Sequence, residues 1–362
     1  MIWTNICLSL QRQKDYYKKD YFRGMILVTG GTGLVGAHLL YQLCLNHDNI
    51  RATYRKPQKL KETQRVFSYY TQNSSELFSK IEWVKADITN IPELEDAFLN
   101  INQVYHCAAL VTFEPDKYFD LRKTNIEGTA NVVNLCIENQ IDKLCYVSSI
   151  AALGEETSPE IPISETSEWN TDKDHNVYAI SKHGAELEVW RGTQEGLNAI
   201  IVNPGVIIGA GFWNHGGSAS LFKKAFKGIS HYSTGNTGFI DVTDLTKIMV
   251  YLMKNSQPNE NYICISSHLT FKAFFDLLCV ELGKSVPKRK ASTILLEIGW
   301  RLDWLNNKIF GKRRQLSKQL ARSLNQLNYY DNSKLKSVIP FELTNIKESI
   351  TTNCKLYLED NN

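Results

Sequence analysis

The chain has little excess charge and no long apolar run. Its 362 residues carry 41 Lys and Arg against 38 Asp and Glu, a net charge of +3, which is too small to indicate a nucleic-acid-binding surface. Residues 198–222 contain no Lys, Arg, Asp or Glu, but they include proline and many glycines, so we expect no membrane-spanning segment. Residues 1–10 lack a basic leader and a following small-residue cleavage site, so we expect no signal peptide.

The sequence also has no Cys-x-x-Cys pair and no metal-ligand spacing among its histidines. Its eight cysteines are scattered, and several of them lie among apolar residues: Cys136, Cys145, Cys264 and Cys279. Buried, reduced thiols are typical of a cytoplasmic protein, and we expect no metal site. Met25 opens the first apolar segment directly, so we expect either that residues 1–24 form a loose extension or that Met25 is the native start.

A glycine-rich turn near the start predicts a phosphate site. Met25–Val28 is a short apolar strand candidate, and Leu34–Leu45 has apolar residues at helical spacing. Gly30, Gly33 and Gly36 lie three residues apart between and within these elements, which allows a tight turn and close approach of the backbone to a pyrophosphate. The amino end of the helix adds amide donors and partial positive charge.

A tyrosine and a lysine farther along the chain predict a proton donor. Tyr178 and Lys182 are four residues apart and share one face of the helix expected over 177–190. A neighbouring ammonium group favours the phenolate, so we expect the pKa of Tyr178 to be lowered. The alternative is an exposed aromatic and a lysine on an ordinary amphipathic helix. Lys143–Val147 is a strand candidate that ends in Ser148 and Ser149, at the sheet edge where ligands bind in open parallel sheets.

These motifs together resemble the extended short-chain dehydrogenases/reductases of the NAD-dependent epimerase/dehydratase superfamily, from Met25 to about Leu343. The pattern is closest to dihydroflavonol-reductase-like and 3β-hydroxysteroid-dehydrogenase-like members. Besides the glycine motif, the matching segments are Ala86-Asp87-Ile88, His106-Cys107-Ala108-Ala109, Asn125 within NIEGT, the Ser149, Tyr178 and Lys182 set, Asn203-Pro204-Gly205-Val206 and Asp241-Val242-Thr243-Asp244.

The resemblance implies a catalytic or cofactor-binding role for residues in these segments. It assigns the catalytic positions to Ser149, Tyr178, Lys182 and the supporting Asn125, with Ser148 as the alternative hydroxyl. The cofactor-binding residues that it implies are Gly30, Thr32, Gly33, Leu34, Val35, Gly36, Arg55, Asp87, Ile88, Cys107, Ala108, Ala109, Tyr178, Lys182, Pro204, Gly205 and Val206. We interpret His106 as a packed or hydrogen-bonded residue and not as a catalyst.

The expected fold is α/β, with a Rossmann-type doubly wound parallel sheet and a smaller, mostly C-terminal α/β substrate lobe. Strand candidates at 50–54, 81–85, 103–106, 143–147 and 199–202 alternate with helical stretches. We assign residues 25–206 and about 236–256 to the nucleotide domain, about 207–235 and 257–341 to the lobe, and 342–362 to a C-terminal helix or tail. A homodimer through the helices that carry Asn125 and Tyr178 is expected from the resemblance only.

The end of the second strand predicts NADP(H) as the preferred cofactor, with NAD(H) as the alternative. The segment from Ile50 to Lys56 offers no carboxylate for a ribose 2′-hydroxyl. Arg55, helped by Lys56, instead suits a 2′-phosphate through charge-assisted hydrogen bonds. The other interpretation is that Arg55 covers the adenine or faces solvent.

The resemblance implies hydride transfer between NADP(H) and the carbonyl or alcohol of an apolar small molecule, with Tyr178 as general acid and base. Ser149 would hold the carbonyl oxygen, and Lys182 would hold the nicotinamide ribose. A nucleotide-sugar epimerase or dehydratase that retains NAD is the main rival. The segment from Ser149 to Gly154 departs from this rival in two ways. It lacks the Thr-Asp-Glu signature expected of a sugar dehydratase, and it has Leu153 where sugar epimerases usually have an aromatic residue. A non-catalytic dinucleotide-binding scaffold is the second rival.

The stretch Ala291–Phe310 is expected to form a helix with two apolar faces. Its main stripe covers an arc of about 100° and is interpreted as core: Ile294, Leu295, Ile298, Leu302, Leu305 and Ile309. Trp300 and Trp304, on roughly the opposite side, are expected to pack locally. Basic clusters at 288–290 and 312–314 flank the helix. We interpret them as a solvated face, with attraction to anionic lipid or to an acidic substrate group as the alternative.

Overall fold

The computed structural model describes residues 24–361, apart from 157, 159, 312, 313 and 315. The expectation of a loose extension over 1–24 therefore lies outside the described residues, except for Gly24. Among the described helices, none is both long and apolar enough to cross a bilayer.

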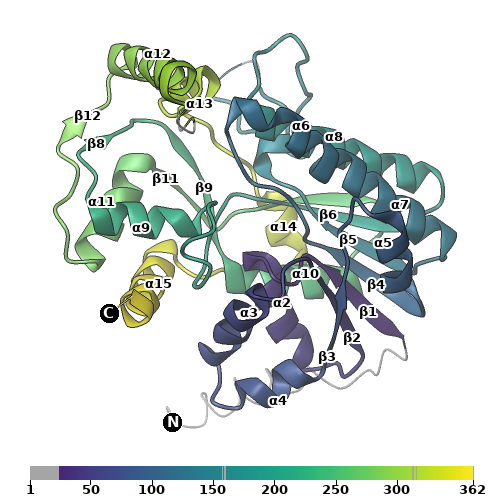
Figure 1. Cartoon of the computed structure of the whole chain (residues 1–362). Helices are drawn as coiled ribbons and strands as arrows, with labels where there is room; N and C mark the ends of the chain where they lie inside the picture. The colour runs from purple at the N-terminus through teal and green to yellow at the C-terminus, as the bar shows by residue number, and fades with distance from the viewer. Residues whose placement is uncertain (1–23, 157, 159, 312–313, 315, 362) are drawn as a thin grey trace.

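A seven-stranded parallel sheet forms the centre of the molecule (Figure 1). Its strands, in the order in which they lie side by side, are β10 (Glu260–Cys264), β6 (Ala199–Pro204), β5 (Lys143–Val147), β4 (Ile101–His106), β1 (Met25–Thr29), β2 (Ile50–Tyr54) and β3 (Ile81–Lys85). Every neighbouring pair is parallel. The chain order reverses beside β1, which lies between β2 and β4, and ligands bind at such switch points.

Helices cover both faces of this sheet, as a Rossmann-type fold requires. One face carries α2 (Leu34–Cys44), α3 (Lys59–Ser68), α4 (Ser74–Ser79) and α10 (Val242–Asn255), and the other carries α5 (Ile91–Phe98), α7 (Gly128–Glu138) and α8 (Val177–Gln194). Leu39 of α2 and Met249 of α10 belong to one buried cluster. Val132 of α7 and Val189 of α8 belong to a second cluster. The burial of these apolar faces explains why the sequence alternates between strand and helix periodicity.

A smaller lobe packs beside the carboxyl edge of the sheet. Its elements are β7 (Val206–Ile208), α9 (Ala219–Lys227), β8 (His231–Tyr232), β9 (Asn236–Asp241), β11 (Ser267–Thr270), α11 (Phe271–Glu281), β12 (Arg289–Lys290), α12 (Thr293–Phe310), α13 (Lys318–Ser323) and α15 (Ile346–Asn361). Phe222, Phe239 and Phe274 are fully buried in its core. The described part of the C-terminal segment is the helix α15, which packs in this lobe.

Three segments lie in a different domain from the one expected. Glu260–Cys264, assigned to the lobe, is the edge strand of the main sheet and pairs with β6, and α14 (Ser333–Val338) packs on the same core through Leu335. In contrast, β9, assigned to the nucleotide domain, pairs with β7 and β11 in the lobe. The cause is that α10, between these two strands, packs on the main sheet and delivers the next strand to the free edge of β6.

Candidate active site

The predicted site residues lie where parallel strands end at one edge of the sheet. Gly30 follows β1, Cys107 follows β4, Ser149 follows β5 and Pro204 ends β6. The carboxyl ends of these four strands face the same crevice, because neighbouring strands in the sheet are parallel. The glycine turn and the hydroxyl groups therefore come together as the sequence predicts.

The glycine turn has no room for side chains at two of its positions. Gly30 has φ +71°, and a Cβ there would lie 2.6 Å from the Ala108 backbone. A Cβ on Gly36 would lie 2.3 Å from the Gly30 carbonyl oxygen. Gly33 N–H donates to that oxygen at 3.0 Å, and Gly30 N–H donates to Thr53 Oγ1 at 3.1 Å. Glycine is therefore required at 30 and 36 for the fold, whereas Gly33 faces the pocket.

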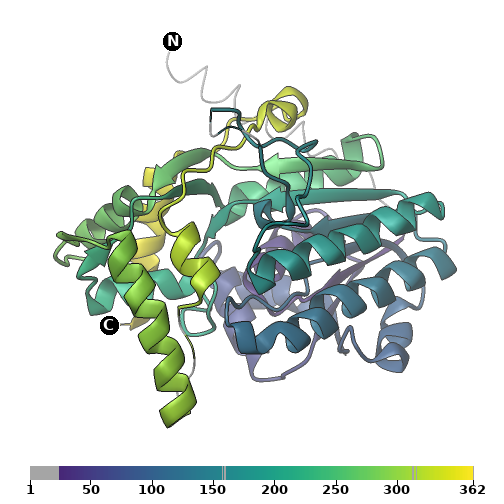
Figure 2. The ribbon, with the colours of Figure 1, turned by 90° about the horizontal axis from the view of Figure 1, so that it is seen from above.

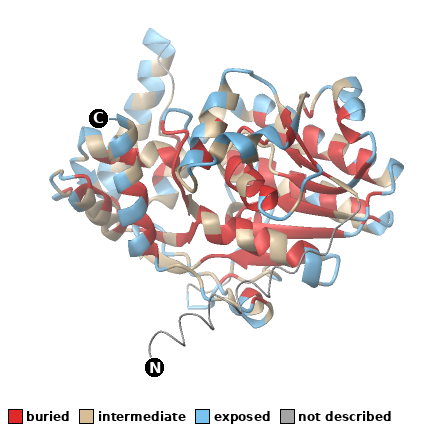
Figure 3. Cartoon of the chain, turned by 90° about the horizontal axis from the view of Figure 1, so that it is seen from below, coloured by how far each residue is buried: buried red, intermediate tan, exposed pale blue. Residues whose placement is uncertain are grey.

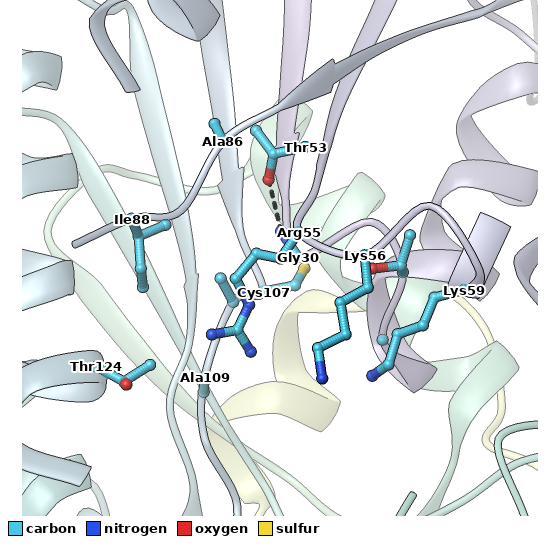
Figure 4. Close-up of a pocket in the computed structure, with 13 residues that line it drawn as sticks. Gly30, Thr53, Arg55, Lys56, Lys59, Ala86, Ile88, Cys107, Ala109 and Thr124 are labelled. Atoms are coloured by element: carbon cyan, nitrogen blue, oxygen red, sulfur yellow. Dashed lines mark hydrogen bonds between the residues drawn. The ribbon is translucent and has the colours of Figure 1, made fainter. Parts of the chain in front are cut away.

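The amino end of α2 is suited to an anion. The first amides of any helix have no intrahelical acceptor. Here the N-cap residue is Gly33, which has no side chain to accept from them, and the first turn has no acidic residue, so these amides are available to a bound anion. The pocket beside this helix end is lined by Gly30, Thr32, Gly33, Thr53, Arg55, Lys56, Lys59, Ala86, Ile88, Cys107, Ala108, Ala109 and Thr124 (Figure 4). Apart from Thr124, which lies in the π-helical turn Arg122–Glu127, these residues lie at or after the ends of β1, β2, β3 and β4, and together they fit an elongated group with phosphates.

Three cationic side chains line this pocket from the segment after β2. Arg55, Lys56 and Lys59 extend into it in Figure 4. Burial and the charges of Arg55 and Lys56 lower the pKa of Lys59, against the opposing effect of Glu62. Arg55 also lies 3.4 Å from Asp87 Oδ2. Burial alone would raise the pKa of Asp87, but hydrogen bonds from Thr89 and the Arg55 charge outweigh it and lower the pKa.

Lys59 and Thr53 were not predicted as site residues. The sequence signal for Lys59 is a third basic residue, one helical turn after Arg55, in the first turn of the helix that follows β2. Thr53 is one of two buried polar residues of β2, the other being Arg51. The structure explains why a hydroxyl side chain is present at position 53, because Thr53 Oγ1 accepts a hydrogen bond from the Gly30 N–H of the glycine turn.

Ser149 and Tyr178 form the hydroxyl pair of the site. Tyr178 is buried at the first turn of α8, and its pKa is affected by a hydrogen bond with Ser149. Asn176 caps this helix by accepting the Ala179 N–H at 2.9 Å, and Ser149 Oγ caps the following short turn through Ala151 N–H at 3.1 Å. The Ser149 hydroxyl is therefore held by its cap, and the Asn176 cap fixes the start of the helix that carries Tyr178.

The predicted lowering of the Tyr178 pKa is wrong for this structure. Burial raises the pKa of Tyr178 to about 12, and the Ser149 hydrogen bond offsets only part of this effect. Lys182 Nζ instead donates to the Val147 carbonyl oxygen at 2.8 Å. Burial lowers the pKa of Lys182 to about 8, against the opposing charges of Glu186 and Cys107. Tyr178 is thus protonated at neutral pH, which suits a proton donor.

A buried carboxylate that the sequence analysis did not select lies behind these residues. Glu186 Oε2 accepts hydrogen bonds from Ser148 Oγ at 2.5 Å and from Asn203 Nδ2 at 2.8 Å. Asn203 Nδ2 also donates to the Ser149 carbonyl oxygen at 3.2 Å. The available signal was spacing, because Glu186 follows Lys182 by one helical turn on the same face of α8. Ser148 therefore faces this carboxylate, while Ser149 pairs with Tyr178.

Asn125 and His106 both have structural partners. Asn125 is buried in a π-helical turn, where its side chain exchanges hydrogen bonds with both backbone groups of Leu110 and donates to Ser181 Oγ at 3.0 Å. His106 binds Thr29 Oγ1 at 2.7 Å and Thr129 Oγ1 at 3.0 Å, and burial with the Lys182 charge lowers its pKa to about 3. His106 is a buried hydrogen-bonded residue, as expected.

Several predicted cofactor residues lie outside the pocket lining. Leu34 packs with Phe212 and Val66, and Val35 packs on the main core. Pro204, Gly205 and Val206 join β6 to β7, where a Cβ on Gly205 would lie 2.3 Å from the Gly238 carbonyl oxygen. Asp87 lies in the adjoining depression with Arg55 and Thr89. Cofactor contact by these residues stays a prediction.

Comparison with known proteins identifies a family and several similar reductases. The sequence pattern of the "NAD dependent epimerase/dehydratase family" matches residues 26–264. Tetraketide alpha-pyrone reductase 1 of Arabidopsis thaliana is 25% identical over 284 residues, 75% of this chain and 85% of that protein. Anthocyanidin reductase of the same plant is 24% identical over 318 residues, 78% of this chain and 91% of that protein.

The fold is also that of a solved epimerase structure. UDP-glucose 4-epimerase of Thermotoga maritima superposes with a TM-score of 0.72 at 17% identity, over 93% of this chain and 99% of that one. The pocket has the features that a nicotinamide dinucleotide needs, which are a glycine turn without space for side chains, an uncapped helix end and cationic walls. The chain belongs to the NAD-dependent epimerase/dehydratase family, as an enzyme of the NAD(P)-dependent oxidoreductase and epimerase type.

Proposed function

We propose that this enzyme is an NADP(H)-dependent reductase or dehydrogenase of apolar carbonyl compounds and alcohols. The observation that carries the cofactor preference is the cluster of Arg55, Lys56 and Lys59 in the pocket. A 2′-phosphate adds about two negative charges to the adenosine ribose, and a guanidinium with two ammonium groups matches them. The nearby acidic side chain of Asp87 is already engaged by Arg55 and Thr89, and Glu62, which acts on Lys59, is another acidic side chain that faces this cluster.

The reductase assignment is supported by the proton-donor geometry. When bound, NADPH would supply the hydride that reduces the carbonyl carbon. Tyr178 is protonated and gives its phenolic proton to the carbonyl oxygen, which becomes the alcohol, while Ser149 donates a hydrogen bond to the same oxygen. Lys182 would hold the cofactor ribose at the end of β5, where its ammonium group donates a hydrogen bond to the Val147 carbonyl oxygen. The two relatives named above are reductases by name.

An apolar substrate is supported by the side chains around Tyr178. The Phe113 ring lies 5.2 Å from the Tyr178 ring, at an interplanar angle of 60°. Phe113 is 39% exposed and Val111, two residues before it, is 44% exposed, so the segment that contacts the Tyr178 ring presents apolar side chains to solvent. An apolar ketone would cover these side chains when it reaches Tyr178, which favours it over a sugar nucleotide.

The test is turnover with each of the two substrate classes. Purified protein is incubated with NADPH and a panel of aryl and alicyclic ketones, and separately with UDP-sugars, and the products are identified by mass spectrometry and NMR. We expect NADPH consumption with formation of an alcohol, and a loss of at least about 100-fold in kcat for Tyr178→Phe with NADPH binding retained. Epimerised UDP-sugar without net NADPH consumption would contradict the proposal.

A further inference from the structure

The apolar stripe of α12 faces outward, contrary to its interpretation as core. No residue of this helix is buried. The exposed members of the stripe are Ile294 (73%), Leu295 (43%), Ile298 (50%), Leu302 (56%), Leu305 (43%) and Ile309 (60%). Periodicity alone shows that a helix has an apolar face but does not show what covers that face.

The helix is attached to the lobe through a different face. Gly299 comes close to Leu316, and the Leu316 N–H donates to Asp303 Oδ2 at 3.2 Å. Figures 2 and 3 show α12 projecting from the body of the molecule, with exposed and half-buried surface along its length. The stripe is therefore not covered by the described part of the chain, and apolar patches of this kind mark docking surfaces.

The charge around this helix identifies the kind of surface that it fits. Residues 284–322 contain eleven Lys and Arg and two acidic residues, a net charge of +9, which leaves −6 for the rest of a chain whose total is +3. Glu297 pairs with Arg301 at 2.5 Å, and Asp303 pairs with Arg314 at 3.7 Å, so both acidic residues are compensated. Lys288, Arg289 and Lys290 are exposed, and only Ala291 and the N-cap Ser292 separate them from the helix.

We propose that α12 and its basic flanks dock the enzyme on an anionic lipid surface. The helix lies in the plane of the membrane with its isoleucine and leucine stripe inserted at the level of the headgroups. Lys288, Arg289 and Lys290 lie near the lipid phosphates. An amphipathic helix with this arrangement binds by apolar burial and by attraction to anionic lipids together. The proposal does not depend on the identity of the substrate.

Sedimentation with lipid vesicles tests the proposal on the full chain. Sucrose-loaded vesicles of phosphatidylcholine alone, or mixed equally with phosphatidylglycerol, are incubated with wild type and variants. Wild type is expected to sediment with the mixed vesicles and to dissociate at about 1 M salt, where the Debye length falls to about 3 Å. The double variant Ile298→Glu/Leu302→Glu is expected to lose at least about tenfold in partitioning. Reversal of Lys288, Arg289 and Lys290 to Glu should cause a similar loss.

The matched control is Leu45→Glu, which changes a leucine of similar exposure, 48%, at the end of α2 in the other domain. It should bind vesicles like wild type. Circular dichroism and thermal unfolding verify that every variant is folded, and folding is expected because all substituted side chains are exposed. Three results would overturn the proposal: no binding of wild type to mixed vesicles, equal binding to both compositions, or a dimer in sedimentation velocity that Leu302→Glu dissociates. The last result would assign the stripe to a second copy of the chain.

Discussion

The Ser148 hydroxyl donates a hydrogen bond of 2.5 Å to Glu186 Oε2, so the two adjacent serines after β5 face different partners. Ser148 is turned into the buried side of α8, and Ser149 is the serine that pairs with Tyr178. The same contact explains why a carboxylate is tolerated inside the protein. Burial raises the pKa of Glu186, and hydrogen bonds from Ser148 and Asn203 counteract this effect.

The two serines should therefore respond differently to substitution. Ser149→Ala should lower kcat by about 100-fold or more, because the carbonyl oxygen loses a donor in the transition state. Ser148→Ala should leave kcat within about threefold of wild type and lower the free energy of unfolding by about 1–2 kcal/mol, because the Glu186 carboxylate loses a buried partner. Steady-state kinetics and urea unfolding of both variants check this. Equal losses of kcat would contradict it.

Glu186 should act as a positioning residue. Glu186→Gln keeps an acceptor of the same size, so its unfolding free energy should be closer to wild type than that of Glu186→Ala. The alanine variant leaves the Ser148 hydroxyl without this acceptor, and Asn203 keeps only its bond to the Ser149 carbonyl oxygen, at a cost of about 1–3 kcal/mol. The pKa of Lys182, about 8, already includes the raising effect of the Glu186 charge, so removal of this charge should lower the pKa of Lys182 further. The alkaline limb of kcat/KM should therefore move to lower pH in both variants. An unchanged pH profile would contradict this role.

Substitutions at two glycines of the turn should affect different properties, namely folding stability at Gly36 and cofactor affinity at Gly33. Gly36→Ala places a Cβ 2.3 Å from the Gly30 carbonyl oxygen and should lower the free energy of unfolding by about 1–3 kcal/mol. At Gly33 the nearest atom to a Cβ is 3.4 Å away, so Gly33→Ala should fold normally. Its added methyl group faces the pocket, and NADPH affinity should fall about tenfold. Thermal unfolding and NADPH titration distinguish the two effects, and the reverse pattern would refute this assignment.

Buried neutral histidines should make the protein sensitive to acid. Burial lowers the pKa of His106 from 6.5 to about 3 and that of His38 from 6.5 to about 4. Below pH 6.5 these two histidines therefore bind protons in the unfolded chain but stay neutral in the folded chain. The stability that they contribute is fully present above pH 6.5 and is lost as the pH falls toward 4 and below. Each can contribute up to about 1.4 kcal/mol per pH unit to the slope. Urea unfolding from pH 7 to 4 should show a shallower slope for His106→Gln than for wild type or for the exposed control His231→Gln. Parallel slopes would contradict it.

Local sequence patterns were sufficient for the main sheet and its glycine turn. The strand predicted over 50–54 is observed at the same residues, as are those over 81–85 and 143–147. The turn with Gly30 at positive φ follows β1 as expected. These features depend on short-range periodicity and on backbone conformations that glycine allows. They can therefore be predicted from the residues of each segment alone.

The features that could not be predicted depend on long-range packing. Glu260–Cys264 joins the main sheet because α10 returns the chain to that domain, which the strand itself does not encode. The outward direction of the α12 stripe depends on which face meets Leu316. The pKa of Tyr178 depends on burial and on the direction in which Lys182 extends, and neither is contained in the four-residue spacing.

The most direct test of the account is the affinity of the protein for NADPH and NADH, measured by fluorescence titration of wild type and Arg55→Ala after bound nucleotide has been removed. The cationic pocket predicts that wild type binds NADPH at least about tenfold more tightly than NADH. Arg55→Ala should lower the affinity for NADPH by about tenfold and change the affinity for NADH by less than about twofold. Tighter binding of NADH, or an equal loss for both nucleotides in Arg55→Ala, would contradict the assignment of this pocket to NADP(H).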